Sequence, residues 1–429
     1  MFKYSPFKAL TNDQAIAIEG ILESLFAERE TGEQQPIVIQ GDPGTGKTIV
    51  AVYLMKLLRD IATSRPDEAL DVDSVFADFF QDGYRQEAAS MRIGLVVPQL
   101  SLRKTVEKVF AKTPGLEKTM VLAPFDLAGD IETFDLLIVD ETHRLQQRNN
   151  QPAAVLNTKF KETNIKLLGS DEVHFTQLDW VKAMSKNQIF LLDKAQSVKP
   201  ADLPESTIEA LLTSAQSTGH YFGLTSQMRV NGGADYIAYI GEILHGTYQG
   251  ELKTFGTYDL QLFENFEDMQ KTILEKEEKH GLARIVAGFA WPWATRNGAS
   301  HDIEVDGAKL TWNRRDYDWI NSKTSLDEVG SIHTVQGYDL NYAAVIIGPD
   351  LGFDPVAQKL VFHRENYHDK KGKENNKVLG KVYSDEDMLD FVVNIYRVLM
   401  TRGVLGTYVY VSDPDLKKYL STYISWKTS

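Results

Sequence analysis

The residues with the clearest chemistry are Gly41-Asp42-Pro43-Gly44-Thr45-Gly46-Lys47-Thr48, which fit the pattern G-x-x-x-x-G-K-[ST]. Glycines at these positions let backbone N–H groups curl around phosphate oxygens, and a following helix adds the positive end of its dipole. Lys47 would reach the β- and γ-phosphates, and the Thr48 hydroxyl would ligate Mg²⁺. The pattern therefore predicts a site for a nucleoside triphosphate.

A second reactive group stands at the end of an apolar run, where 136–139 is followed by Asp140 and Glu141. One carboxylate at the carboxyl end of a strand can hold Mg²⁺, and another beside the γ-phosphate can orient and deprotonate a water molecule. We assign Asp140 to the metal, together with Thr48, and Glu141 to the catalytic base. After a phosphate loop, this pair predicts hydrolysis of the triphosphate rather than binding alone.

The elements that position these residues follow from the hydrophobic pattern. Short apolar runs rich in β-branched residues recur at 37–39, 93–97, 136–139, 166–168, 189–192, 285–289, 343–347 and 407–411. Stretches with helical spacing, such as 16–26 and 50–58, lie between them. Because strands that alternate with helices are typical of parallel sheets, we predict two α/β domains, 1–225 and 226–429.

Two charged stretches look like insertions in these domains. An acidic one lies near 61–90 and a basic one near 363–381. Charge runs of this kind are usually solvated surface segments, which is what we expect for both. The basic one also suggests a mobile clamp.

Composition limits the class of protein. The 429 residues are 43% hydrophobic and 25% charged, as in soluble globular proteins. The absence of cysteine excludes disulfides, thiolate metal sites and cysteine nucleophiles. We see neither a secretory signal nor an apolar run of the roughly 18 residues that a membrane helix needs, so we expect a cytoplasmic protein with no membrane partner. The net charge of −14 argues against non-specific coating of nucleic acid, but not against a local basic track.

The acidic pair continues as Asp140-Glu141-Thr142-His143-Arg144-Leu145, which resembles motif II of superfamily 1 and 2 helicases. Further motifs follow in the order of that superfamily, from residue 10 to residue 411. Within superfamily 1 the chain resembles the Schlafen-type helicase-like domain family, both in this form of motif II and in Gly288-Phe289-Ala290-Trp291-Pro292-Trp293. Thr142 stands where that family more often has alanine.

The resemblance implies a fold and further site residues. It implies two RecA-like domains with parallel sheets flanked by helices, and ATP with Mg²⁺ in the cleft between them. Gln14 would read the adenine, Gln196 would sense the γ-phosphate, and Arg229 would contact it. Arg402, in the motif VI match, would act as an arginine finger when the second domain closes over the first.

The motif V match is Ser331-Ile332-His333-Thr334-Val335-Gln336-Gly337-Tyr338-Asp339. The resemblance implies that Gln336, Gly337 and Asp339 contact the nucleotide. The chain as a whole lacks the large accessory insertions of processive unwinding enzymes. The resemblance therefore favours ATP hydrolysis over robust duplex separation.

Single-stranded DNA or RNA needs a basic track and stacking platforms. The stretch 91–118 is rich in Lys and Arg and coincides with motif Ia, so we expect Pro98, Arg103 and Lys104 to contact nucleic acid. His333 is a further candidate, alongside an ordinary structural role. Four tryptophans are candidate stacking residues, although tryptophans more often lie in cores; they are Trp291, Trp293, Trp312 and Trp319.

Three functions from different classes remain open. The first is an ATP-dependent translocase or helicase that acts on single-stranded nucleic acid. The second is an ATP-driven switch or assembly subunit that captures a protein partner, for example in phage defense. The third is an inactive nucleotide-binding module, against which the intact Lys47, Asp140 and Glu141 argue.

Overall fold

The computed structural model contains two compact units. Unit 1 comprises Met1–Ser197, Ala201–Ser226 and Asn376–Gly380, and unit 2 comprises Val198–Pro200, Gln227–Asn375 and Lys381–Ser429. The structure describes residues 4–6, 9–31, 35–65, 75–129, 132–148, 154–193, 199–227, 230–315, 318–335, 338–370 and 372–427.

Unit 1 is a parallel sheet with helices on both faces. Its strands are β1 (Ile37–Gly41), β2 (Ile93–Val96), β3 (Val121–Leu122), β4 (Phe134–Val139), β5 (Ser185–Leu192) and β6 (Tyr221–Leu224). Its helices are α1 (Asn12–Thr31), α2 (Lys47–Thr63), α3 (Asp82–Ser90), α4 (Leu100–Phe110), α5 (Ala154–Leu168), α6 (Gln177–Ala183) and α7 (Glu205–Thr218). The strand order is β3-β2-β4-β5-β1-β6, and every pair is parallel.

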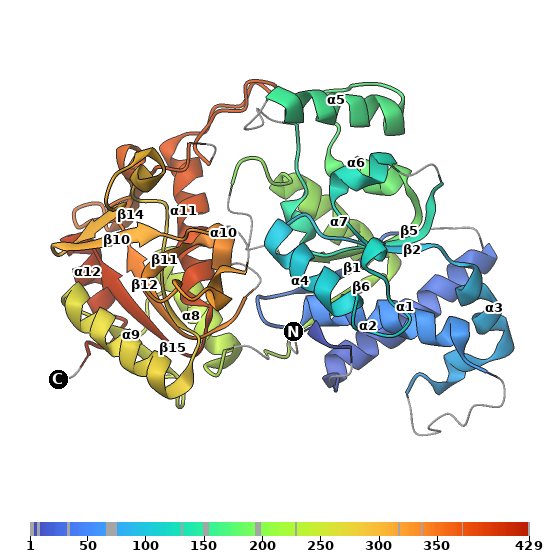
Figure 1. Cartoon of the computed structure of the whole chain (residues 1–429), viewed down its shortest axis with the longest axis horizontal. Helices are drawn as coiled ribbons and strands as arrows, with labels where there is room; N and C mark the ends of the chain where they lie inside the picture. The colour runs from blue at the N-terminus through green and yellow to red at the C-terminus, as the bar shows by residue number, and fades with distance from the viewer. Residues whose placement is uncertain are drawn as a thin grey trace. The chain divides into compact units, whose positions relative to one another are not determined.

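Alternation along the strands builds two cores. Ile37 and Ile39 of β1 face a cluster with α1 to α4, whereas Val38 faces a cluster with α5 to α7. Figure 1 shows α5 and α6 on the opposite side of the sheet from α2 and α3. A parallel sheet covered on both faces explains why its strands read as continuous apolar runs.

Unit 2 repeats this plan with a larger sheet. Its strands are β7 (Asp259–Leu262), β8 (Ala283–Ala287), β9 (Ile303–Val305), β10 (Ala308–Trp312), β11 (Glu328–Ser331), β12 (Leu340–Ile347), β13 (Leu351–Asp354), β14 (Lys359–Phe362) and β15 (Gly403–Val411). Its helices are α8 (Gly233–Leu244), α9 (Phe266–His280), α10 (Ile332–Val335), α11 (Asp385–Met400) and α12 (Pro414–Ser421). The main sheet has the order β7-β15-β12-β8-β11-β10-β9, with only the β9–β10 pair antiparallel, and β13 and β14 form a separate hairpin.

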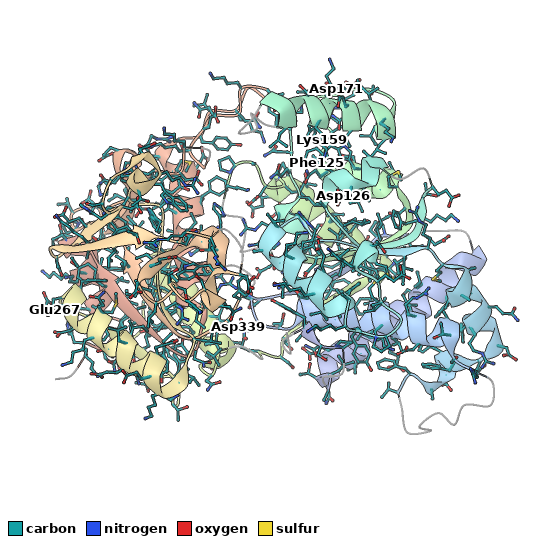
Figure 2. All side chains as sticks on the ribbon, in the orientation of Figure 1. Phe125, Asp126, Lys159, Asp171, Glu267 and Asp339 are labelled. Carbon is teal, nitrogen blue, oxygen red and sulfur yellow. The ribbon has the colours of Figure 1, made fainter. Side chains whose placement is uncertain are left out.

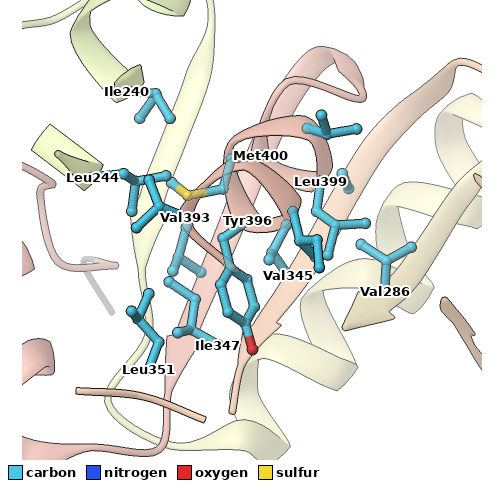
Figure 3. Packing of buried hydrophobic residues seen from close by; sticks show 14 of the residues in the cluster. Ile240, Leu244, Val286, Val345, Ile347, Leu351, Val393, Tyr396, Leu399 and Met400 are labelled. Carbon is cyan, nitrogen blue, oxygen red and sulfur yellow. The ribbon is translucent and has the colours of Figure 1, made fainter. Parts of the chain in front are cut away.

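The core of unit 2 packs α8 and α11 against one face of this sheet. Figure 3 shows Tyr396 and Met400 of α11 beside Val345 and Ile347 of β12. Helix α9 covers the other face through Phe266 and its neighbours. The prediction of two α/β domains with parallel sheets flanked by helices is confirmed.

One detail of the sequence prediction is wrong. The run 166–168 is not a strand but the end of helix α5, where Leu167 and Leu168 pack against the core. A run of three residues, of which only Leu167 and Leu168 are apolar, is too short to show a period and cannot distinguish a strand from a helix. Figure 2 labels Lys159 of this helix and Phe125, whose ring lies 4.9 Å from the Lys159 Nζ.

The acidic stretch 61–90 is not simply a solvated insertion. Its first residues end α2, and its described part, 75–90, contains α3. Phe76 and Phe79 are buried in the core with α1 and α2, and the Phe79 ring stacks 6.1 Å from that of Phe26. In the described part of this stretch, Asp78 and Asp82 are exposed, while Phe76 and Phe79 attach the segment to the core of unit 1. In the part of the chain that the structure describes, no helix is long and apolar enough to cross a bilayer.

Candidate active site

The loop between β1 and α2 has the backbone shape that a phosphate cradle requires. Gly44 and Gly46 have φ angles of 95° and 86°, in the left-handed region that other residues rarely adopt. Helix α2 begins directly afterwards, at Lys47, so its unpaired N–H groups face the loop. Gly41, at the start of the loop, is also required to be glycine, because a Cβ there would lie 2.4 Å from Thr45 Oγ1.

Lys47 is held at the centre of this loop. Its side chain is 7% exposed, and Nζ donates hydrogen bonds to the carbonyls of Gly41 and Asp42. Asp193, at the end of β5, brings a carboxylate oxygen to 3.8 Å from Nζ. The cation is therefore folded back along the loop and neutralised by a carboxylate from the neighbouring strand.

Thr48 and Asp140 meet although they are far apart in the chain. The Thr48 hydroxyl donates a hydrogen bond of 2.6 Å to Asp140 Oδ2, which joins the first turn of α2 to the end of β4. Strand β5 lies between β1 and β4, so all three strands deliver their carboxyl ends to this place. Two hard oxygen donors at this spacing fit Mg²⁺, which takes few protein ligands when phosphates supply the others.

The electrostatics of the acidic pair are uneven. Burial and the neighbouring Glu141 carboxylate raise the pKa of Asp140 to about 6. Burial alone would also raise the pKa of Glu141, but contact with His143 and the charge of Lys47 hold it below its usual range. Glu141 itself has a φ of 51°, a strained conformation for a non-glycine residue at the turn after β4.

His143 lies between two strand ends. Its Nε2 is 3.0 Å from Glu141 Oε2, and its Nδ1 accepts a hydrogen bond of 3.4 Å from the Asp193 N–H. The Nε2 side of the ring faces the Glu141 carboxylate. The imidazole is therefore placed to orient Glu141.

Gln14 contacts the phosphate loop directly. Its Nε2 donates a hydrogen bond of 2.9 Å to the Thr45 carbonyl, and its Oε1 accepts one from the Thr11 N–H. The preceding residue, Asp13, accepts hydrogen bonds of 2.8 Å from the N–H groups of both Thr225 and Ser226. The start of α1 thus connects the loop to the segment after β6.

The motif Ia residues lie after β2, and two of them have intramolecular partners. Arg103 donates to the carbonyls of Val97 and Pro98, at 2.8 and 3.3 Å, and burial lowers its pKa. Lys104 pairs with Glu107 at 2.9 Å. Arg103 therefore supports the end of β2, and Lys104 carries a partly neutralised charge at the surface.

In unit 2, Arg402 and His333 have different surroundings. Arg402 is 1% exposed and donates from Nε to the Val398 carbonyl at 3.2 Å and from Nη1 to the Tyr338 carbonyl at 3.5 Å. Its role at a γ-phosphate stays a prediction. His333 in α10 is exposed, with Nε2 3.7 Å from an Asp369 carboxylate oxygen. Asp339, labelled in Figure 2, directly precedes β12. Gln196, Arg229, Gln336 and Gly337 lie outside the described residues.

The sequence analysis assigned no role to Asp13, His143 or Asp193, although each has a defined contact at this site. Asp13 and Asp193 contact residues that are distant in the chain, and such contacts leave no sequence pattern. His143 contacts Glu141, two residues away, but only the turn after β4 brings the two side chains together. Their only signal was adjacency to Gln14, Glu141 and Gln196.

Comparison with protein families gives one match over most of the chain. The family described as Schlafen group 3, DNA/RNA helicase domain, matches residues 34–413. An uncharacterized protein of Saccharomyces cerevisiae, YPL245W, is 25% identical over 406 residues, which cover 89% of this chain and 83% of the relative.

Three solved helicase structures show weak likeness. The arterivirus nonstructural protein 10 helicase, in complex with DNA, is 12% identical with a TM-score of 0.34, over 94% of this chain and 64% of the viral one. Pif1 helicase from Candida albicans is 10% identical with a TM-score of 0.33, over 96% and 97%. Pif1 from Bacteroides, in complex with ADP-AlF3 and single-stranded DNA, is 11% identical with a TM-score of 0.28, over 85% and 92%.

Proposed function

Because the chain belongs to the Schlafen group 3 DNA/RNA helicase domain family, we propose that it is an ATP-hydrolysing, helicase-like motor that acts on single-stranded DNA or RNA. The observation that carries the proposal is the 2.6 Å hydrogen bond between Thr48 and Asp140, with Glu141 next to it. A phosphate loop alone would support only binding. A loop joined to a strand end with two carboxylates has the groups for hydrolysis.

In this mechanism the chain's own groups divide the work. The N–H groups of the loop and of the first turn of α2 bind the phosphates, and Lys47 moves from the carbonyls of Gly41 and Asp42 to the β- and γ-phosphates. Thr48 and Asp140 would hold a magnesium ion, which supplies positive charge to the triphosphate. Glu141 accepts the proton of the attacking water, while His143 keeps its carboxylate in place.

The family resemblance supplies the remaining assignments of this proposal. Gln14, which lies in α1 and contacts the loop, reads the adenine, and Gln196, Arg229 and Arg402 sense or stabilise the γ-phosphate. The nucleotide-contacting residues of motif V are Gln336, Gly337 and Asp339.

On the nucleic-acid side, the proposal assigns strand contacts to Pro98, Arg103, Lys104 and His333. Because the chain carries a net charge of −14, we expect binding without nucleotide to be weak and salt-sensitive. Tight binding that resists salt would contradict this part of the proposal.

The test is ATP turnover at low salt, with and without single-stranded DNA and RNA. We expect stimulation by at least one of them, and a loss of at least about 100-fold in kcat for Glu141→Gln, as for removal of a general base. Glu162→Gln, at an exposed glutamate of unit 1 outside the basic stretch 91–118, is the matched control and should keep full activity.

The outcomes separate the three classes of function. Strong hydrolysis that neither nucleic acid changes would favour an ATP-driven switch that captures a protein partner. Wild-type turnover no faster than that of Glu141→Gln would point to an inactive nucleotide-binding module.

A further inference from the structure

A pocket of about 710 Å³ opens on unit 2 where β8 and β11 end. Three half-buried aromatic rings line it, those of Phe289, Trp291 and Trp293, together with the imidazole of His333. The Phe289 ring centroid lies 5.4 Å from that of His333 and 6.5 Å from that of Trp293. The pocket therefore has an aromatic wall built from the loop after β8 and from α10.

This wall rests on a rigid base. Trp312 of β10 is 1% exposed, and its ring centroid lies 5.6 Å from that of Phe289 and 6.1 Å from that of Trp293. Trp312 is thus an ordinary core residue, whereas Trp291 and Trp293 keep part of their rings at the surface. Adjacent aromatic rings that stay partly exposed over a packed base are typical of a binding surface.

The charges around the pocket indicate what it binds. The Arg296 guanidinium lies 3.7 Å from the Trp293 ring centroid, and Lys370 also lines the pocket. The one acid among the described lining residues is Asp369, which lies 3.7 Å from His333 Nε2 and accepts a hydrogen bond of 2.9 Å from the Gly372 N–H. Cations beside aromatic rings suit a flat aromatic ligand that carries negative charge, and they disfavour the quaternary ammonium groups that other aromatic cages bind.

We propose that this pocket binds one nucleobase of a single-stranded nucleic acid, in contact with the exposed part of its aromatic wall. The Arg296 guanidinium already lies over the Trp293 ring, so the base packs against the part of the wall that Arg296 leaves open. Its flanking phosphate lies beside Arg296 and Lys370. The inference rests on the proposed function and locates a base contact in unit 2. A free mononucleotide has the same chemistry, so the experiment must separate the two sources.

The experiment measures the affinity of fluorescent single-stranded DNA and RNA oligonucleotides by anisotropy at low salt. We expect Trp293→Ala to weaken binding about 5- to 150-fold, the range for loss of one stacked base, and Trp293→Phe to keep most of the affinity. Trp426→Ala is the matched control, because Trp426 is 39% exposed and lies outside the pocket. The control should bind as the wild type does.

Two further arms identify the ligand. Free AMP should compete only weakly with the oligonucleotide. If AMP displaced the oligonucleotide at a concentration lower than that of the oligonucleotide, the ligand of the pocket would be a free mononucleotide and not a strand. Lys370→Ala changes an exposed side chain and so provides a test even if the tryptophan variant folds poorly. It should reduce the slope of log affinity against log salt concentration by about one, as expected for the loss of one phosphate contact.

The failure of this inference is distinct from failure of the proposed function. A wild type that binds neither DNA nor RNA refutes both. A wild type that binds an oligonucleotide, with folded Trp293→Ala binding it equally well, refutes the pocket assignment and leaves the motor standing.

Discussion

A buried carboxyl in unit 2 should make stability fall as pH rises. Asp350 follows β12, is 1% exposed, and accepts a hydrogen bond of 2.5 Å from the Tyr396 hydroxyl. Among the described residues, none donates a hydrogen bond to its other oxygen, Oδ2. Burial raises the pKa of Asp350 to about 7, although the bond from Tyr396 acts in the opposite direction. Figure 3 shows the Tyr396 ring among the apolar side chains of the core.

The sign and size of the effect follow from proton linkage. Between about pH 4 and pH 7 the folded protein holds a proton on Asp350 that the unfolded chain has released, so the free energy of unfolding decreases as pH rises. The slope is about 1.4 kcal/mol per pH unit, which gives a loss of about 2–3 kcal/mol between pH 5 and pH 8. Asp350→Asn keeps an acceptor for Tyr396 but cannot ionise, so this loss should disappear.

The assay is urea unfolding followed by tryptophan emission across this pH range. Every tryptophan except Trp180 belongs to unit 2, so the signal reports mainly on that unit. Asp390→Asn, at an exposed position of α11, controls for the removal of one negative charge and should follow the wild type. Parallel curves for wild type and Asp350→Asn would refute the reasoning.

Two further changes probe the contacts around the phosphate loop. Asp13→Asn should destabilise unit 1 by about 1–3 kcal/mol at pH 7, because one carboxylate oxygen accepts from both Thr225 and Ser226. These contacts lower the pKa of Asp13, so the stabilisation is present above about pH 4 and is lost as pH falls; urea midpoints that match the wild type at pH 7 would contradict this. His143→Phe should lower kcat on the order of tenfold with little change in KM for ATP, since the buried ring lies against Glu141, the proposed base; a change confined to KM would argue against that role.

The chemistry of the phosphate loop could be predicted because it is local. The eight residues from Gly41 to Thr48 need only their own backbone angles and the helix that follows them. The same holds for Asp140 and Glu141, which end an apolar strand. A contiguous motif of this kind predicts the same local structure wherever it lies in the fold.

Other predictions failed or were missing because their causes are not contiguous. The run 166–168 is too short to distinguish a strand from a helix, and it forms the last turn of helix α5. Phe76 and Phe79 become core residues only because α1 and α2 leave a surface for them. The acidic residues of this stretch predict a solvated surface, whereas no local pattern predicts that its two phenylalanines are buried.

The amino-acid sequence by itself determined the α/β class, the phosphate loop and the acidic strand end, since each depends on periodicity or on neighbours within one segment. Only the tertiary structure decided that Thr48 meets Asp140, that Asp13 holds a segment 212 residues away, and that Trp293 lines a cationic pocket while Trp312 is core. The reason is physical: hydrogen bonds and stacking act over a few ångströms, and only the packing of the sheets brings such distant residues that close.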